Sequence, residues 1–298
     1  MESKQANIPD IDFEQGQQKA FEFQIVSNRE ILSGNFRGGH TPFRPHRIQF
    51  YAILFVIEGE GRHFIDFNSH TYKRGSIIFI AKDQVQRFER NLKREAFLML
   101  FTQAFLEKSS MGSNLMQQLS LYNYHLYTPV LQLEERQMGL FMGLIRQMKR
   151  EFAATEDSLT EEIILSSLKI FLCLAERIRK EKMDFSGPRR YHKAFTDFEK
   201  LLQQHLLQER QVSFYANQLS ISTKKLNRIT QSVVQQTAKN YIHSLLILEI
   251  KRLLVNTSLS IKEIAFTSGF EEPTNFVKYF KKFAQLTPGE FRKQYDQS

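Results

Sequence analysis

The stretch Ser268–Phe283 reads SGFEEPTNFVKYFKKF and places four aromatic residues among three lysines, shortly after a Gly-Phe pair and a proline. At ~100° per residue, the four aromatic residues fall on one face of a helix. Pro273 suits the first turn of such a helix, where no backbone donor is needed. The stretch therefore predicts a short helix with a buried face of Phe276, Tyr279, Phe280 and Phe283 and a polar, basic face of Thr274, Asn275, Lys278, Lys281 and Lys282.

The residues before this helix repeat an earlier part of the chain. Ile264–Phe270 precedes the helix, and Tyr215–Ile221 precedes a second predicted helix that runs from Ser222 to about Val233. Ala265 and Ala216 hold matching places, where a small residue lets two helices cross closely, and the second turn is one residue longer. Each copy therefore predicts a helix, a short turn and a helix, which is the helix-turn-helix pattern.

The backbone turns of the two copies differ in one residue type. Gly269 suits the turn of the second copy, and Ser220 takes its place in the first copy. Between the copies, His243–Asn256 predicts a strongly apolar helix that holds them at a fixed separation.

Two helix-turn-helix units on one chain suit double-stranded DNA. The second helix of each unit can enter a major groove, and successive grooves on one face of DNA lie about 34 Å apart. Arginine and asparagine side chains contact guanine and adenine edges, whereas lysines supply attraction to phosphates. A lone surface lysine is more often only solvated, but two copies, a joining helix and local charge favour nucleic acid. The candidate DNA-binding residues are Lys224, Lys225, Asn227, Arg228, Thr274, Asn275, Lys278, Lys281 and Lys282.

The positive charge of the chain lies mainly in its last third. From residue 187 to the C-terminus there are 17 Lys and Arg residues against 9 Asp and Glu residues, which gives +8 of the formal net charge of +9. A basic lobe beside a nearly neutral remainder indicates a polyanionic partner, although a solvated basic surface would show the same charge.

Length and composition bound the class of protein. A chain of 298 residues predicts two domains, and a hydrophobic content of 42% supplies their cores. Met1–Gln18 is polar, unlike a signal peptide, and no stretch reaches the ~20 apolar residues of a membrane span. The single cysteine, Cys173, lies among apolar residues, so we expect a buried thiol, no intrachain disulfide and no cysteine-rich zinc site. A cytoplasmic protein fits these features.

The first third of the chain has the pattern of short strands. Phe50–Ile57 predicts a buried strand, Glu58–Gly61 a tight turn, and Arg62–Phe67 a strand that pairs back as a hairpin. Asn68–His70 predicts another turn, and further apolar runs follow, up to Phe101. Many short strands joined by glycine-containing turns are typical of a small antiparallel barrel or sandwich.

The period becomes helical after about residue 103. Two amphipathic helices are expected, at Leu133–Phe152 and Leu159–Glu181, before the Gly-Pro pair at 187–188 breaks the pattern. The apolar stripe of the second helix either forms a homodimer or packs on the barrel of its own chain; its candidate dimerisation residues are Ile164, Leu168, Phe171, Leu172 and Ala175. The expected organisation is an arm at 1–20, a barrel at 21–130, a helical dimerisation segment at 131–183, a linker at 184–192 and a DNA-binding domain at 193–298.

The stretch Ile261–Arg292 resembles the AraC/XylS family of bacterial transcription regulators. The elements IKEIA, SGF, FVKYFKKF and TPGEFR stand at the spacing of that family. The first unit departs from the family pattern, because Thr230-Gln231 and Gln235 replace a Phe-Lys pair and a glycine. The resemblance implies that base-reading positions fall on Lys224, Asn227 and Arg228 in the first unit and on Thr274, Asn275 and Lys278 in the second.

The N-terminal part is similar to the cupin-like effector domain of such regulators, through HRIQFYAILFVIEGEGRHFIDF, RGSIIFI and AKDQVQRF. The resemblance implies an α+β chain, with an N-terminal antiparallel cupin-like β-barrel with flanking helices and a C-terminal all-α domain with two helix-turn-helix units. Cupin enzymes bind a metal through an HxH pair, a Glu and a later His, but this chain has no HxH, and Gln86 stands at the later position. We therefore expect no metal, no cofactor and no enzymatic activity.

An effector pocket at the mouth of the barrel is the expected function of this part. The candidate histidines are either pocket residues or partly exposed barrel residues. Arg44 and Arg47 either hold a carboxylate or phosphate, or are surface arginines. The candidate effector-binding residues are Phe36, His40, Arg44, His46, Arg47, Phe55, His63 and Tyr72.

The sequence therefore predicts a transcription regulator, more often an activator in this family, that is controlled by a small organic effector. Its expected partners are double-stranded DNA of a promoter or operator, RNA polymerase and a second copy of the chain, without a membrane. The alternatives are a DNA-binding or adaptor protein whose barrel senses nothing and a cupin-type enzyme.

Overall fold

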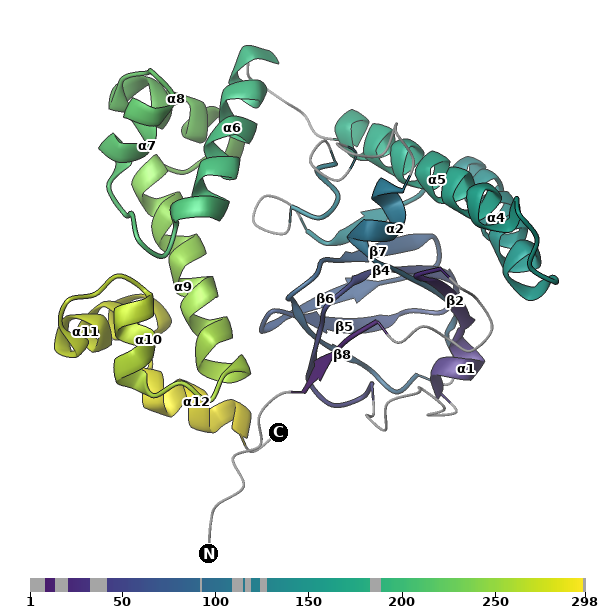
Figure 1. The fold of residues 1–298 in the computed structure, drawn as a ribbon, viewed down its shortest axis with the longest axis horizontal. Helices are drawn as coiled ribbons and strands as arrows, with labels where there is room; N and C mark the ends of the chain where they lie inside the picture. Colours follow the sequence, from purple (N-terminus) through teal and green to yellow (C-terminus); the bar gives the residue numbers. More distant parts are fainter. Residues whose placement is uncertain are drawn as a thin grey trace, which may run out of the picture. The chain divides into compact units, whose positions relative to one another are not determined.

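The computed structural model of this chain describes residues 9–13, 21–32, 42–91, 93–108, 115, 119–123, 128–182 and 189–296. The chain divides after Lys182 into two compact units, an N-terminal one of strands and helices and a C-terminal one of helices alone (Figure 1). Within the described residues, none of the helices combines the length and the apolar character that crossing a membrane requires.

The N-terminal unit is built on two five-stranded sheets, and every strand pair except β1–β3 is antiparallel. The α+β expectation with an antiparallel N-terminal fold is therefore confirmed. The first sheet has the order β1 (Asp10–Ile11), β3 (His46–Ile48), β8 (Val85–Phe88), β5 (Gly61–Ile65) and β6 (Asn68–Tyr72). The second has the order β10 (Val130–Gln132), β7 (Ser76–Ile80), β4 (Tyr51–Glu58), β9 (Glu95–Phe101) and β2 (Phe23–Ser27).

Strand β4 is buried on both faces, which explains its unbroken apolar run. Leu54 and Val56 contribute to a core shared with the first sheet, whereas Ile53 and Phe55 contribute to a second core shared with helices. Those helices are α2 (Gln103–Glu107), α4 (Glu135–Ala153) and α5 (Thr160–Lys182), while the short α1 (Asn28–Leu32) packs beside β2 and β9. Figure 1 shows α4 and α5 along one side of the sheets, with β5 and β8 on the other side.

Two expected turns of this unit are wrong. The strand after the Glu58–Gly61 turn does not pair back on β4: β5 pairs with β6 and β8 of the other sheet, because the chain changes layers at Gly59, whose φ is +90°. The predicted turn at 68–70 belongs to β6 instead, and the reversal occurs at Asp66 and Phe67, with φ of 46° and 70°. Two successive residues with positive φ match the right-handed twist of the flanking strands.

Part of the expected N-terminal arm joins a sheet. Asp10 and Ile11 form β1 and pair with β3, and the Asp10 carboxylate forms an ion pair with the Arg47 guanidinium. Residues 1–8 and 14–20 lie outside the described residues.

The apolar stripe of α5 packs within its own chain. The five candidate dimerisation residues, Ile164, Leu168, Phe171, Leu172 and Ala175, are fully buried against the second sheet and α4. The ring of Phe171 meets that of Phe141 on α4 edge to face at 4.8 Å. These side chains are core residues, so the intrachain alternative holds for them. Cys173 points the other way and is exposed, contrary to the expected burial.

The C-terminal unit consists of helices: α6 (Arg189–His205), α7 (Val212–Gln218), α8 (Thr223–Val234), α9 (Ala238–Asn256), α10 (Ile261–Thr267), α11 (Pro273–Ala284) and α12 (Pro288–Asp296). A cluster of buried rings from α6, α7 and α9 forms part of its core: Phe195, Phe198, Tyr215 and Tyr241. Residues 189–192 of the expected linker are helical, and residues 183–188 lie outside the described residues.

Candidate nucleic-acid interface and effector domain

The two predicted turns have the same backbone hydrogen bonds. In the first, the N–H of Ile221 donates to the carbonyl oxygen of Ala216 at 2.9 Å. In the second, the N–H of Phe270 donates to the carbonyl oxygen of Ala265 at the same distance. The residue before each donor, Ser220 or Gly269, lies in the left-handed region, with φ of 53° and 72°. Both segments are therefore helix-turn-helix units with one backbone geometry.

The repeat extends beyond these units to a third helix in each copy. Gln235 ends α8 and Gln285 ends α11, both in the left-handed conformation. Thr237 then accepts a hydrogen bond from a backbone N–H in the first turn of α9, and Thr287 does the same for α12. The repeating element is thus three helices long, α7–α9 and α10–α12, which the sequence pattern alone did not reveal.

The second helix of each unit has a buried apolar face and an exposed polar face. In α11, Phe276 and Phe280 are fully buried, while in α8 Leu226 and Ile229 are fully buried. The predicted buried positions Phe276 and Phe280 are therefore confirmed, whereas Tyr279 is only partly buried and Phe283, which was expected on the same buried face, is 41% exposed. The exposed side chains of the two helices include Lys224, Lys225, Arg228, Thr274, Asn275, Lys278, Lys281 and Lys282.

Asn227 is the exception among the candidate DNA-binding residues. Its side chain is half-buried, and its Oδ1 accepts a hydrogen bond from the backbone N–H of Ala238 at 2.9 Å. This contact ties α8 to the first turn of α9, where backbone N–H groups have no intrahelical partner. Arg228, one turn after Lys224 on the exposed face of α8, is then the best-placed side chain of the first unit for a bidentate base contact.

Within the C-terminal unit, side-chain contacts tie the two helix-turn-helix units together. Arg210, in the loop before α7, donates to the backbone oxygen of Gly269, and its guanidinium lies 4.1 Å from the centroid of the Phe270 ring. His243 on α9 shares a hydrogen bond of 2.6 Å with the Tyr279 hydroxyl on α11 and stacks on Phe283. These contacts fix α11 against the first unit.

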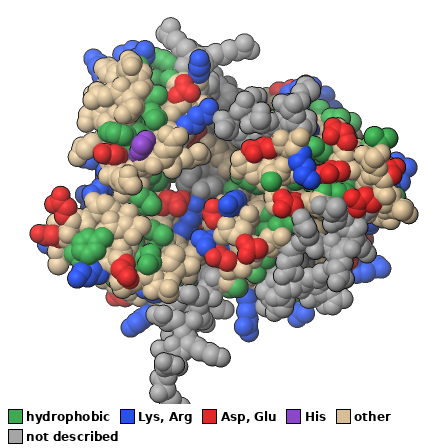
Figure 2. All heavy atoms as spheres, in the orientation of Figure 1, with side chains coloured by type: hydrophobic (Ala, Val, Ile, Leu, Met, Phe, Trp, Pro, Cys, Tyr) green, Lys and Arg blue, Asp and Glu red, His purple; other side chains and the backbone are tan. Residues whose placement is uncertain are grey.

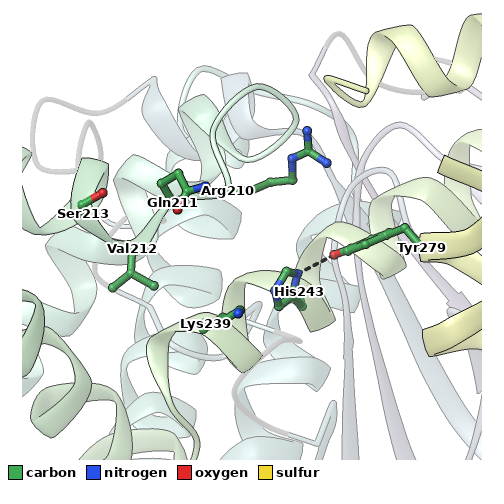
Figure 3. Close-up of a pocket in the computed structure, with 7 residues that line it drawn as sticks. All are labelled: Arg210, Gln211, Val212, Ser213, Lys239, His243 and Tyr279. Carbon is green, nitrogen blue, oxygen red and sulfur yellow. Dashed lines mark hydrogen bonds between the residues drawn. The ribbon is translucent and has the colours of Figure 1, made fainter. Parts of the chain in front are cut away.

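A cleft of 540 Å³ lies between these contacts (Figure 3). Figure 3 shows Lys239 and His243 entering from α9, Tyr279 from α11 and Arg210 from the loop before α7; Gln211, Val212 and Ser213 complete the lining. Burial, together with nearby Lys239 and Arg210, lowers the pKa of His243, so its ring is neutral at pH 7. The positive charge of the cleft at neutral pH therefore comes from Arg210 and Lys239.

Charged side chains of both signs are visible on the face shown in Figure 2. On the face shown in Figure 2, basic and acidic side chains alternate, and neither sign forms a wide field. Exposed lysine and arginine side chains of the C-terminal unit include those on α8 and α11.

The structure separates the candidate effector-binding residues into three groups. Phe36 and His40 lie outside the described residues. Arg44 is exposed, and Arg47 is paired with Asp10. His46, His63 and Tyr72 are buried on strands of the first sheet, whereas Phe55 is buried on the other side of β4, in the core that faces the helices. Phe55 therefore does not face the space between the sheets.

His46 and His63 are brought together by Gln86. His46 pairs with Gln86 across β3 and β8, and the Oε1 of Gln86 lies 3.0 Å from Nε2 of His63. This polar row faces apolar residues of the second sheet, including Leu54 and Ile78. Among the described residues no group of three or more His, Cys, Asp and Glu is arranged to hold a metal ion.

Sequence reasoning missed Arg94, the largest fully buried side chain of the described residues, which is 1% exposed. It stands between Lys93 and Glu95, directly before β9, and charged neighbours on both sides are typical of a surface residue. Its guanidinium lies over the rings of Tyr72 and Phe88, at 5.7 and 5.6 Å from their centroids. The only sequence signal was its place at the end of a loop between two strands.

We expect the N-terminal unit to lose stability in mild acid because of His63. Burial lowers the pKa of this fully buried imidazole from 6.5 to about 3, so between these values the unfolded chain binds a proton that the folded chain does not. Stability then rises with pH in this window and falls as the pH drops below about 6.5. Going from pH 7.5 to 5 should cost about 2 kcal/mol. Urea unfolding at both pH values measures this cost, and His63→Gln should remove most of it; an unchanged pH dependence in that variant would contradict the assignment.

Two family models match the chain and together cover most of it. The model described as an AraC-like ligand binding domain matches residues 36–168, and a helix-turn-helix domain model matches residues 215–294. The first contains His63, Gln86 and Arg94, and the second contains both turns and both exposed basic helices.

Known regulators are similar over nearly the whole length. The HTH-type transcriptional activator RhaR of Mannheimia succiniciproducens is 25% identical over 280 residues, which is 91% of this chain and 95% of that protein. The Msm operon regulatory protein of Streptococcus mutans is 25% identical over 249 residues, which is 82% of this chain and 84% of that protein. A crystal structure of ToxT from Vibrio cholerae O395 matches with a TM-score of 0.41 at 14% identity and covers 91% of this chain and 96% of ToxT. The repeated helix-turn-helix units and the two matched domains together show that this chain belongs to the AraC/XylS family of transcription regulators.

Proposed function

We propose that this chain regulates transcription by placing α8 and α11 in successive major grooves of one DNA site, in the cytoplasm. The observation that carries the proposal is that the two turns share one backbone hydrogen bond and one left-handed residue, and that each is followed by a helix with a buried apolar face and an exposed face rich in Lys, Arg and Asn. Two matching units on one chain require a target with a repeat of its own, and the DNA double helix provides one.

The helix between the units has a length that suits this target. α9 has 19 residues, so it is about 28 Å long, which is close to the ~34 Å between successive major grooves. The proposed base contacts come from Arg228 in the first unit and from Thr274, Asn275 and Lys278 in the second. Lys224, Lys225, Lys281 and Lys282 are proposed to attract phosphates.

We propose activation of transcription as the direction of control, through a small organic effector bound in the N-terminal unit and through RNA polymerase at the promoter. The support is the AraC-like ligand binding domain over residues 36–168 and the naming of the similar RhaR and RhaS proteins as transcriptional activators. Effector binding shifts DNA affinity only if the effector binds one arrangement of the protein more tightly than another.

A homodimer is proposed through the outward faces of α4 and α5, since the inward face of α5 is core. Leu140 on α4 is 55% exposed and Ile170 on α5 is 51% exposed, so both helices carry a large apolar side chain on the face turned away from the core. Replacing both with glutamate is expected to convert dimers to monomers in sedimentation velocity, with the unfolding temperature unchanged within a few degrees. A variant with Lys169→Glu is the matched control for added negative charge on the same helix. Dimers that persist in the double variant would place the interface elsewhere.

The DNA-binding proposal is tested with the full-length chain and the promoter DNA beside its own gene. Binding is measured by fluorescence anisotropy over a series of salt concentrations, with a scrambled duplex of equal length as the competitor. Preference for the promoter by a factor of 10³ or more, together with a steep salt dependence, is the expected result. Equal affinity for the scrambled duplex would contradict sequence-specific regulation.

A further inference from the structure

The space between the two sheets contains a positive charge without a protein counter-ion. Arg94 is 1% exposed, and among the described residues no carboxylate forms an ion pair with its guanidinium. Its Nε donates to Oδ1 of Asn28 at 2.8 Å, and its Nη1 donates to the Tyr72 hydroxyl at 3.3 Å. Its Nη2 has no hydrogen-bond partner. Buried charges in proteins are normally paired, because an unpaired one loses its hydration without compensation.

The neighbouring contacts of Arg94 compensate this charge only in part. Asn28 and Tyr72 are neutral partners, and the rings of Tyr72 and Phe88 add cation–π attraction. An arginine side chain keeps its positive charge in a protein interior. The site therefore retains an unused pair of N–H donors that suit an anion.

A second polar atom without a hydrogen-bond partner belongs to His63, whose side chain contacts the same aromatic ring as Arg94. The ring of His63 packs edge to face on Phe88 at 4.7 Å, on the same ring that Arg94 covers. Because Oε1 of Gln86 can only accept, Nε2 of His63 carries the proton, and Nδ1 is a bare acceptor. Nδ1 is fully buried and has no hydrogen-bond partner. A ligand that satisfies both atoms needs an anionic oxygen for Arg94 and a hydroxyl donor for His63.

The backbone around Arg94 is adapted to its position. Gly59 has a φ of +90°. A Cβ on this residue would lie 3.1 Å from Cα of Arg94 and 3.0 Å from the carbonyl oxygen of Lys93. A larger residue would push this segment away, so the close approach of the β4–β5 connection helps to keep Arg94 in the interior.

We propose that Arg94 and His63 form the effector-recognition site of the N-terminal unit, and that the effector is a small hydroxylated oxyanion, such as a hydroxy acid or a sugar phosphate. Arg94 binds the carboxylate or phosphate oxygens, and Nδ1 of His63 accepts a hydrogen bond from a hydroxyl group beside them. This inference rests on the proposed regulation by an effector and names the chemical class of that effector. Arg94 thereby takes the anion-binding role that was expected of Arg44 or Arg47. Arg44 is exposed, and Arg47 is paired with Asp10.

The test uses thermal unfolding of the full-length chain with matched pairs of charged and neutral probes. Lactate is compared with lactamide, and glycerol 3-phosphate with glycerol, at equal ionic strength. Lactate or glycerol 3-phosphate, whichever matches the site, is expected to raise the unfolding temperature in a saturable way, while its neutral partner has no effect. The pair that responds distinguishes a carboxylate from a phosphate.

Three variants assign the effect to its residues. Arg94→Met is expected to weaken binding of the responding anion at least 100-fold, and Arg44→Met, an exposed arginine, is expected to leave it unchanged. Arg94→Lys keeps the charge without the planar fork and should bind about 10-fold more weakly, which keeps the test valid if Arg94→Met folds poorly. His63→Phe should reduce binding of lactate but not of acetate, which lacks the hydroxyl.

The proposal is overturned if neither anion stabilises the wild type more than Arg94→Met, or if lactamide or glycerol stabilises as much as its charged partner. Promoter binding by the wild-type chain without any anion is measured separately. DNA binding without an anion response would refute only the effector class, whereas an anion response without DNA binding would refute the proposed regulation.

Discussion

Replacing Gly269 with alanine should destabilise the C-terminal unit by about 2–4 kcal/mol, a large effect for the addition of one methyl group. A Cβ at this position would lie 2.6 Å from the carbonyl oxygen of Leu207, a backbone atom that cannot rotate away. The φ of +72° adds strain for any residue with a Cβ. Because Arg210 donates to the Gly269 oxygen, the substitution also disturbs the contact between the two units. Urea unfolding followed by helical circular dichroism measures the loss.

The first unit supplies the matched control. Ser220 occupies the equivalent place with φ of 53°, and it is exposed. In Ser220→Gly, relief of the left-handed strain stabilises the folded state, whereas the greater freedom of glycine stabilises the unfolded chain. We therefore expect the free energy of unfolding to rise by between zero and about 1 kcal/mol. If Ser220→Gly lowered the free energy of unfolding as much as Gly269→Ala does, glycine would not be favoured at position 220, and the two turns would not be equivalent.

Replacing Arg228 or Lys278 with alanine should lower the affinity for the promoter 10- to 100-fold each. Both side chains are exposed on the second helix of a unit, in equivalent places relative to the buried faces of α8 and α11. Loss of a base contact costs about 1–3 kcal/mol and relaxes selectivity at one base pair, whereas loss of a phosphate contact weakens all sequences and reduces the salt slope by about one. Anisotropy with the promoter and with single-base variants separates these outcomes.

Lys293→Ala provides the control for charge alone, because Lys293 is exposed on α12, which we do not assign to DNA. It should change affinity less than threefold at 150 mM salt. An effect as large as that of Lys278→Ala would show that net charge, rather than the position of α11, determines binding.

The C-terminal unit was predictable from sequence because its signals are local. The aromatic face of α11, the small residues Ala216 and Ala265, and Gly269 each act within one or two turns of chain, so their spacing reveals the motif. A helix at His243–Asn256 was expected, but that a third helix belongs to each repeat was not, because its caps, Thr237 and Thr287, are polar residues of a common type.

The N-terminal unit was harder to predict because its arrangement depends on distant parts of the chain. The alternation of Gly61–Ile65 indicates a strand but does not identify the strand beside it, and the assumed neighbour β4 was wrong. The stripe of α5 looks the same whether it covers a sheet or a second copy. Arg94 was invisible because its burial results from Tyr72, Phe88 and Asn28, which are distant in sequence.

The rigid connection through α9, Arg210 and His243 has a consequence for how the operator is read. In the proposed complex, once α8 or α11 is docked, the other helix is held near its own groove at an effective concentration in the millimolar range or above. Each half-site therefore adds nearly its full free energy to the total. Inserting five base pairs between the half-sites turns the second groove to the opposite side of the DNA, so a tether of this stiffness should forfeit the entire second contribution. A flexible linker at the same place would tolerate the insertion, and the spacing of operator halves is thus set by the protein.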